Sequence, residues 1–412
     1  MFSFLSSIGP EIPMSLFLMS LLGLRAKVWP RASLFIKTTP EKLFALLDIA
    51  DGKREDWGRT TTLTELTDTE RGIFRKTYTT TLASGVSRDS SALFSMRRRQ
   101  QPELLEIQRE GLEGKSLNNE LLSQRYDIAA EGEGARLTMT YEWGPRPLVA
   151  QLLARADLWG GVYRLRGLAE RGVPNDLPYQ LISAGVMILT GALSLGAFAM
   201  LVGWAIAGLL IAALFVHELG HLLAYRMMGQ PWGRMVFLPF LGAMALPRMR
   251  FDSQGQAVFA ALMGPGFSIL LALVCTMHAS AFGQLGSEFL MQLGLVAVLL
   301  NIFNLLPAEP LDGGVALRSV LGKLLGKHAR FGLIAVGSLM IAVGIYWSFV
   351  LLALFGGIAI VLNLRARNID HGLIPLSRLQ VTTSLFCYCF LVAAYVKLFT
   401  FYFELGNLRA AV

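Results

Sequence analysis

Long apolar runs fill most of residues 178–403, and no other feature restricts the fold of this chain as much. An apolar run of about 20 residues is long enough to cross the hydrocarbon core of a bilayer as a helix. We expect a polytopic α-helical membrane protein with six or seven spans, because 331–364 forms either one long helix or two short ones that turn at Trp347-Ser348. The candidate spans are 179–201, 204–226, 254–277, 288–307, 331–347, 348–364 and 380–403.

The composition divides the chain into unlike parts. Only 16% of the residues are charged, against about a quarter in a typical soluble domain, and 54% are hydrophobic. The charged residues concentrate between residues 25 and 175. We therefore predict an apolar N-terminal segment (1–27), a soluble α+β domain (28–175), a membrane domain (178–403) and a short C-terminal tail (404–412).

The first 24 residues are apolar but are interrupted by Pro10, Glu11 and Pro13. No basic region precedes them, and no clear cleavage site follows, so they lack the full pattern of a signal peptide. An interfacial segment, a strand of the following domain and a membrane span all remain open.

The soluble domain has the pattern of a mixed fold. A strand-like segment (28–37) is followed by a helix that begins at Thr39-Pro40 and, at the end, by a long amphipathic helix (147–170). Between the helices lie strand-like runs at 60–67, 72–82, 90–96, 103–109, 124–129 and 136–143. This order, with the segment TTPEKLFALLDIADGKREDW, resembles the START-like (SRPBCC) superfamily.

That resemblance implies a helix-grip fold, with an apolar cavity between the sheet and the final helix. A lipid or a small hydrophobic ligand would bind there and regulate the membrane domain. A structural or partner-docking domain is equally compatible with the sequence, because no catalytic cluster occurs in residues 28–175.

The net charge of +8 does not indicate a nucleic-acid partner, because no basic cluster is interleaved with exposed aromatic residues. The basic residues instead fall in the loops on one side of the predicted spans. The positive-inside rule then places these loops and the N-terminal domain in the cytoplasm, and we expect a multi-pass protein of a bacterial inner membrane. Cys275, Cys387 and Cys389 lie in apolar runs without metal-ligand spacing, which indicates buried hydrophobic packing.

One apolar run contains the motif His217-Glu218-x-x-His221. On a helix, residues i and i+4 share a face, so the two imidazoles can bind one metal with the glutamate beside it. In hydrocarbon, these polar groups would cost several kcal/mol unless they were paired or bound to a metal. A catalytic zinc has about three protein ligands, and the third candidate is Asp312, with Glu309 in the same loop as its competitor.

Three motifs follow one another along the apolar runs: H217-E-L-G-H221, then G264-P-G266, then N304-L-L-P-A-E-P-L-D312-G-G. In this order they resemble the site-2 protease family of intramembrane zinc metalloproteases (peptidase family M50). The resemblance implies Zn²⁺ held by His217, His221 and Asp312, with Glu218 as the general base. It also implies that Asn304 positions the substrate or the oxyanion, although a helix-packing amide is an equal alternative.

The resemblance implies a membrane-protein substrate whose transmembrane helix is partly unwound near the site. Gly313-Gly314 should allow a backbone turn beside the metal, whereas Gly264-Pro265-Gly266 should only kink or pack a helix. Residues 229–250 are broken by Gly and Pro, which favours a re-entrant hairpin that lines the site over a lipid-facing loop. By analogy with the family, the edge of this hairpin would pair with an extended substrate.

Two other functions use the same residues. A transporter would pass a metal through the ligands, and a catalytically silent lipid sensor would keep only the fold. The sequence favours the metalloendopeptidase over the transporter, because a single three-ligand position with an adjacent glutamate is one site and not a pathway of sites.

Overall fold

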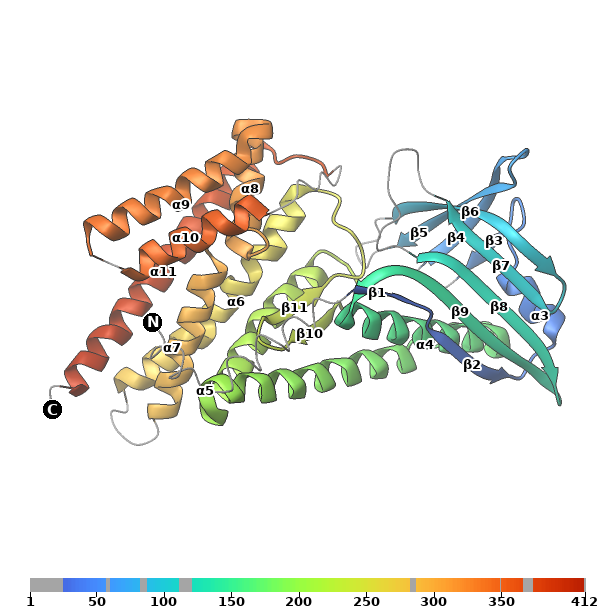
Figure 1. Cartoon of the computed structure of the whole chain (residues 1–412), viewed down its shortest axis with the longest axis horizontal. Coiled ribbons are helices and arrows are strands. Elements are labelled where there is room, and N and C mark those ends of the chain that lie inside the picture. Colours follow the sequence, from blue (N-terminus) through green and yellow to red (C-terminus); the bar gives the residue numbers. More distant parts are fainter. Residues whose placement is uncertain are drawn as a thin grey trace, which may run out of the picture. The chain divides into compact units, whose positions relative to one another are not determined.

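A computed structural model describes residues 25–56, 60–81, 87–110, 121–281, 287–348, 350–365 and 373–410 (Figure 1). The chain forms two compact units, residues 1–192 and 193–412. Residues 1–24, for which the sequence leaves three interpretations open, lie outside the described residues.

The first unit is built around a nine-stranded sheet with the order β1-β9-β8-β7-β6-β5-β4-β3, in which β2 also pairs with β9. All of the pairings are antiparallel. The strands are β1 (Arg25–Val28), β2 (Arg31–Ile36), β3 (Arg54–Asp56), β4 (Thr60–Asp68), β5 (Ile73–Thr81), β6 (Ser87–Gln100), β7 (Leu104–Glu110), β8 (Leu121–Glu131) and β9 (Gly134–Pro147). Every strand-like run of the sequence is therefore confirmed as a strand, whereas the short strands β1 and β3 were not predicted.

Two helices pack on this sheet. Helix α3 (Pro40–Leu47) begins where the side chain of Thr39 accepts a hydrogen bond from the amide of Lys42, at 3.3 Å. Helix α4 (Leu148–Arg171) ends at Gly172, whose φ of 74° favours glycine. The core contains apolar side chains of both helices, such as Phe44 and Val162, together with those of the sheet. The predicted element order is confirmed: strand, helix, antiparallel strands, long helix.

Helix α5 (Leu177–Met227) begins in the first unit and ends in the second. It is bent at Gly203, whose φ of 79° and ψ of 160° are not helical. The sequence predicts two separate runs, 179–201 and 204–226, and their boundary coincides with this bend. Glycine adopts such a conformation more readily than any other residue, which explains why the break falls at this position.

The second unit contains six further α-helices among the described residues: α6 (Gln254–Ala281), α7 (Ser287–Asn304), α8 (Asp312–Leu325), α9 (Ala329–Tyr346), α10 (Val350–Arg365) and α11 (Arg378–Ala410). Helix α9 ends just before Trp347-Ser348, and α10 follows, so the alternative with two short helices is confirmed. Helix α8 was not predicted, because its basic residues were interpreted as part of a loop.

Four helices of the described chain are long and apolar enough to cross a membrane, by length and composition: 177–227, 254–278, 329–346 and 378–404. The apolar helices 288–304 and 352–364 are shorter. The predicted count of six or seven spans therefore remains a prediction.

Helix α11 is joined to its neighbours by tyrosine hydroxyl groups. Tyr388 donates to the carbonyl oxygen of Leu305 and Tyr395 to that of Pro265, each at 2.7 Å. Polar bonds of this kind lock helices together where apolar surface gives little specificity. Helix α11 thus holds α6 and the segment that follows α7.

Residues 229–250 contain an antiparallel hairpin of β10 (Arg234–Leu238) and β11 (Gly242–Leu246), which agrees with the predicted hairpin. The hairpin lies against α5. A Cβ atom on Gly233 would come within 2.9 Å of the side chains of Leu222 and Tyr225, so only glycine fits there without displacement.

Candidate metal centre

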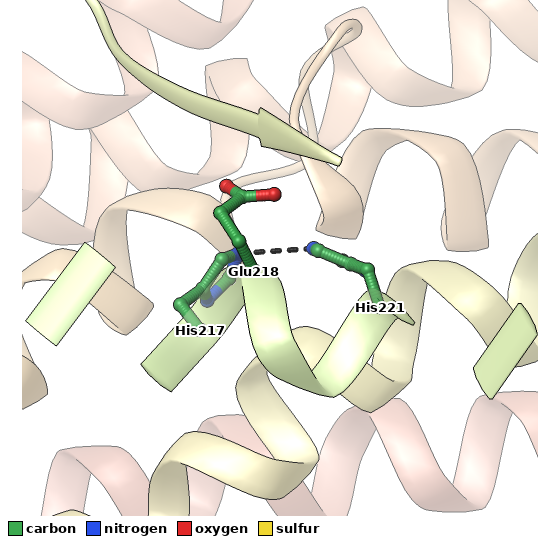
Figure 2. A group of neighbouring side chains, drawn as sticks. All are labelled: His217, Glu218 and His221. Carbon is green, nitrogen blue, oxygen red and sulfur yellow. Dashed lines mark hydrogen bonds between the residues drawn. The ribbon is translucent and has the colours of Figure 1, made fainter. Parts of the chain in front are cut away.

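Helix α5 brings His217, Glu218 and His221 together in the interior of the second unit. Their exposed fractions are 2%, 4% and 7%, and their potential ligand atoms lie within 4.8 Å of one another. Figure 2 shows the two imidazoles facing each other across one helical turn, with the glutamate carboxylate above them and a strand passing over it. The Nε2 atoms of the histidines are 3.1 Å apart.

The other nitrogen of each imidazole has a fixed partner. Nδ1 of His217 lies 2.8 Å from Oδ1 of Asn301, and Nδ1 of His221 lies 2.7 Å from the carbonyl oxygen of Ala260. The orientation of the Asn301 amide is set by its Nδ2, which donates to the carbonyl oxygen of Ala297 at 2.7 Å. Both Nδ1 atoms therefore face acceptors and must donate, so the neutral rings carry lone pairs on both Nε2 atoms.

Asp312 places a third potential ligand atom at the same point. Its Oδ2 lies 3.1 Å from Nε2 of His217 and 3.4 Å from Nε2 of His221. Two lone pairs and a carboxylate oxygen thus converge, and such an arrangement is stable only with a proton or a cation between the atoms. Tetrahedral zinc with bonds of about 2.1 Å separates its ligand atoms by about 3.4 Å. The residues present therefore fit a zinc ion.

The competing carboxylate, Glu309, is directed elsewhere. It pairs with the guanidinium of Arg318. The backbone around it is held by Asn363 of α10, whose Nδ2 donates to the carbonyl oxygen of Pro307 at 2.7 Å, and whose Oδ1 accepts from the amide of Glu309 at 3.3 Å. Asp312 follows as the first residue of α8. The hydrogen bonds of Asn363 to the preceding loop therefore help to fix the backbone position of Asp312.

The prediction that Gly313-Gly314 form a turn is wrong. Both residues lie inside α8, and a Cβ atom on either would come within 2.2 Å of the backbone of the preceding loop, at Leu305 or Ala308. The glycines are needed because the first turn of the helix packs directly on that loop. They bring Asp312 close to the histidines by close packing instead of by a turn.

Gly264 of α6 also belongs to this centre, although the sequence indicated only a kink or packing role for its motif. A Cβ atom on it would lie 2.4 Å from Nε2 of His221 and 3.0 Å from Cε1 of His217. Around Gly266, in contrast, no atom would lie within 4 Å of a Cβ. Gly264 therefore provides the space in which the imidazoles meet.

Asn301 is a site residue that sequence reasoning missed. It is fully buried and lies one turn before Asn304, the predicted substrate-positioning residue, in the same helix α7. The role of Asn304 stays a prediction. The only signal in the sequence for Asn301 is that it is a polar residue in an apolar helix. Nothing in the sequence indicates that its partner is His217.

The first unit contains a cavity of about 180 Å³ between the sheet, the end of α3, and α4. Its polar wall includes the side chains of Tyr78, Tyr126 and Tyr141. Burial raises the pKa of Tyr78 and that of Tyr141 to about 12, so these hydroxyl groups are neutral hydrogen-bonding groups. Tyr126 donates to Oε1 of Gln124 at 2.5 Å. The lining consists of Leu46, Leu47, Ile49, Lys76, Tyr78, Phe94, Ile107, Gln124, Tyr126, Met139, Tyr141, Gly161, Arg164 and Leu165.

Part of the chain resembles known proteins. A zinc metalloprotease of Methanocaldococcus jannaschii is 28% identical over 40% of this chain and 47% of its own length. A Synechocystis protein whose name marks it as a candidate zinc metalloprotease is 32% identical over 35% of this chain and 40% of its own length. The chain thus spans less than half the length of these curated relatives.

Among solved structures, a site-2 protease from Methanocaldococcus jannaschii is 23% identical over 46% of this chain and 88% of its own, with a TM-score of 0.30. Residues 205–345 match the family model described as Peptidase family M50, and this range contains the histidine motif, Gly264, Asn301 and Asp312. Residues 205–345 are therefore similar to peptidase family M50.

Proposed function

We propose that this chain is an intramembrane zinc metalloendopeptidase that hydrolyses peptide bonds within or near the transmembrane segments of membrane proteins. One observation carries the proposal: Nε2 of His217, Nε2 of His221 and Oδ2 of Asp312 converge within 3.1–3.4 Å, beside the carboxylate of Glu218. The curated relatives named as zinc metalloproteases support the metal and the reaction class.

His217, His221 and Asp312 would hold the zinc ion. When bound, zinc lowers the pKa of a coordinated water and polarises the scissile carbonyl group. Glu218 accepts a proton from the attacking water and returns it to the nitrogen of the leaving amine. Asn301 and the carbonyl group of Ala260 keep both imidazoles in the tautomer that leaves Nε2 free.

The substrate must present an extended backbone at this depth, because peptide bonds inside an intact helix are hydrogen-bonded and shielded. The β10–β11 hairpin is a two-stranded sheet with edges that can accept such a backbone. Strand addition would hold the unwound part of the substrate beside α5. Glycine or proline in the substrate helix would favour the unwinding.

The test compares wild type with Glu218→Gln, which keeps the size and polarity of the side chain but removes the base. Both proteins are loaded with zinc, and the new termini of membrane proteins are identified by mass spectrometry. We expect equal zinc content and a loss of cleavage of about 10²- to 10⁴-fold. Cleavage at the wild-type rate would refute the mechanism, and zinc flux across liposomes without new termini would favour the transporter.

We propose a second function, ligand binding, for the first unit, and the cavity beneath α4 supports it. A cavity of about 180 Å³ is close to the about 150 Å³ that accommodates a benzene ring, so a single-ring amphipathic molecule fits better than a phospholipid. The tyrosine hydroxyl groups would bind its polar end. Such a ligand would make the first unit a regulatory domain. Thermal-shift titration of the full chain with phenol, toluene and a long-chain fatty acid tests whether the ligand binds.

The basic residues near the ends of the apolar helices, such as Arg226 and Arg250, support a cytoplasmic position for these ends and for the N-terminal domain of an inner-membrane protein. A cysteine at Arg250 would then be labelled only after the membrane is made permeable. A cysteine at Ser348, which lies in the turn between α9 and α10, would be labelled in intact cells.

A further inference from the structure

Tyr225 continues the row of metal-binding residues along α5. It follows His217 and His221 at intervals of four residues, so all three share one face of the helix. The tyrosine is 5% exposed, and its ring lies beside that of Phe251 with 6.0 Å between centroids. Its hydroxyl group donates to the carbonyl oxygen of Ala245 in β11 at 3.1 Å.

The backbone of Ala245 connects this tyrosine to Glu218. The carbonyl group of Ala245 accepts from Tyr225, and its amide hydrogen-bonds to the carboxylate of Glu218. Ala245 is opposite Met235 in the hairpin. Opposed residues in an antiparallel pair exchange either both hydrogen bonds or neither, so both polar groups of Ala245 point away from β10, toward α5.

The hairpin has little freedom to move at this point. A Cβ atom on Gly233 would lie 2.6 Å from the carbonyl oxygen of Leu246 and 2.9 Å from Cδ2 of Tyr225. The start of β10 and the end of β11 are thus packed directly on the tyrosine. In Figure 2 a strand passes over the carboxylate of Glu218. Because Ala245 belongs to β11, the position of β11 determines where the Ala245 amide meets the carboxylate of Glu218.

We propose that Tyr225 is a positioning residue, whose hydroxyl group holds β11 so that the amide of Ala245 fixes the carboxylate of Glu218 toward the attacking water. This inference rests on the proposed function. Tyr225 acts through Ala245 and provides no ligand to the metal. Orientation of a catalytic group lowers the barrier, and its loss reduces kcat without changing how tightly the substrate binds.

The experiment uses the full chain in detergent micelles with zinc and a fluorogenic transmembrane peptide that contains Gly-Pro in its apolar segment. Tyr225→Phe removes only the hydroxyl group. Ala245→Pro removes the amide donor, and an edge strand tolerates the proline ring where the N–H is outside the ladder. Each variant should lower kcat about tenfold at unchanged KM and zinc content, because the carboxylate of Glu218 is no longer held in its productive orientation.

The double variant distinguishes positioning from a general structural effect. If both changes act through Glu218, the double variant should be no slower than Ala245→Pro alone, since coupled residues are not additive. Tyr402→Phe is the matched control, because Tyr402 is also a buried tyrosine and its hydroxyl group is hydrogen-bonded to Oγ1 of Thr276 at 3.1 Å, away from the metal centre. It should keep the wild-type kcat.

An additive loss of about a hundredfold in the double variant would overturn the inference. So would a wild-type kcat in Tyr225→Phe, an effect on KM alone, or a loss of zinc or thermal stability greater than that of Tyr402→Phe. These results would not contradict the proposed function, provided that Glu218→Gln does not cleave the peptide. Wild-type cleavage of the same peptide by Glu218→Gln would refute the proposed function, and the inference with it.

Discussion

Oδ1 of Asn301 in α7 lies 2.8 Å from Nδ1 of His217 in α5. This contact connects two helices whose contacting residues are 84 positions apart in the sequence. Because the amide is fixed by Ala297, Asn301 selects the tautomer in which His217 can bind a metal through Nε2. The carbonyl oxygen of Ala260 does the same for His221. The orientation of the two imidazoles of α5 is therefore set by partners on two other helices, α6 and α7.

Replacing Asn301 by Leu should weaken zinc binding about 10- to 100-fold, because the imidazole of His217 loses the acceptor that orients it. Competition with a fluorescent zinc chelator measures the affinity. Asn304→Leu is the comparison variant in the same helix, and it should keep the zinc affinity while raising KM. Equal zinc affinity in wild type and Asn301→Leu would contradict the role of the amide.

Asp312→Asn should lose zinc, since an amide oxygen is a far weaker ligand than a carboxylate, whereas Glu309→Gln should retain it because Glu309 pairs with Arg318. Metal analysis after dialysis tests both. Treatment of wild type with a strong chelator should abolish cleavage, and added zinc should restore it. Retention of zinc by Asp312→Asn with loss from Glu309→Gln would reverse the assignment.

Gly264→Ala should disrupt the centre, because the new methyl group would lie 2.4 Å from Nε2 of His221. We expect zinc content to fall below about a tenth of the wild-type value, as the displaced imidazole ceases to be a ligand. Gly266→Ala is the matched control in the same helix, with open space around its Cβ, and it should bind zinc normally. Similar zinc content in the two variants would disprove the close approach.

Gly161→Leu should fill the cavity of the first unit, because Gly161 lines it and no atom would lie within 4 Å of a Cβ at this position. Binding of phenol should be lost, while the thermal stability should rise, in part because glycine costs a helix interior about 1 kcal/mol relative to alanine. Gly161→Ala gives the helix effect alone and should retain binding. Unchanged phenol binding in Gly161→Leu would show that the ligand binds elsewhere.

Glu55 should make the first unit sensitive to acid. Burial acts to raise the pKa of its carboxyl group, but Lys76 and Lys53, at 2.8 and 2.7 Å, hold the pKa below its ordinary value of 4.5. Its stabilising contribution is therefore complete above pH 4.5 and is lost as the pH falls through the lowered pKa. The hydrogen-exchange protection factors of β3–β5, corrected for the intrinsic exchange rate, should fall below pH 4.5 in wild type, and Glu55→Gln should flatten this dependence.

Much of the local structure follows from local chemistry. Alternation of apolar and polar residues predicted the strands of the first unit, and the two separate apolar runs 179–201 and 204–226 agree with the break in α5 at Gly203. The short β3 was missed because three residues carry too little periodicity. Helix α8 was missed because its lysine and arginine residues are as compatible with a basic loop as with a helix at the membrane surface.

The sequence by itself determined that His217, Glu218 and His221 share a helix face, because a spacing of four residues is a local property of the helix. Only the tertiary structure decided which side chains complete the centre. It directs Asp312 to the histidines and Glu309 to Arg318, although the two carboxylates are three residues apart. Only the tertiary structure likewise shows the contacts of Asn301, Gly264 and Tyr225. Contacts between distant segments depend on packing, which no local sequence pattern encodes.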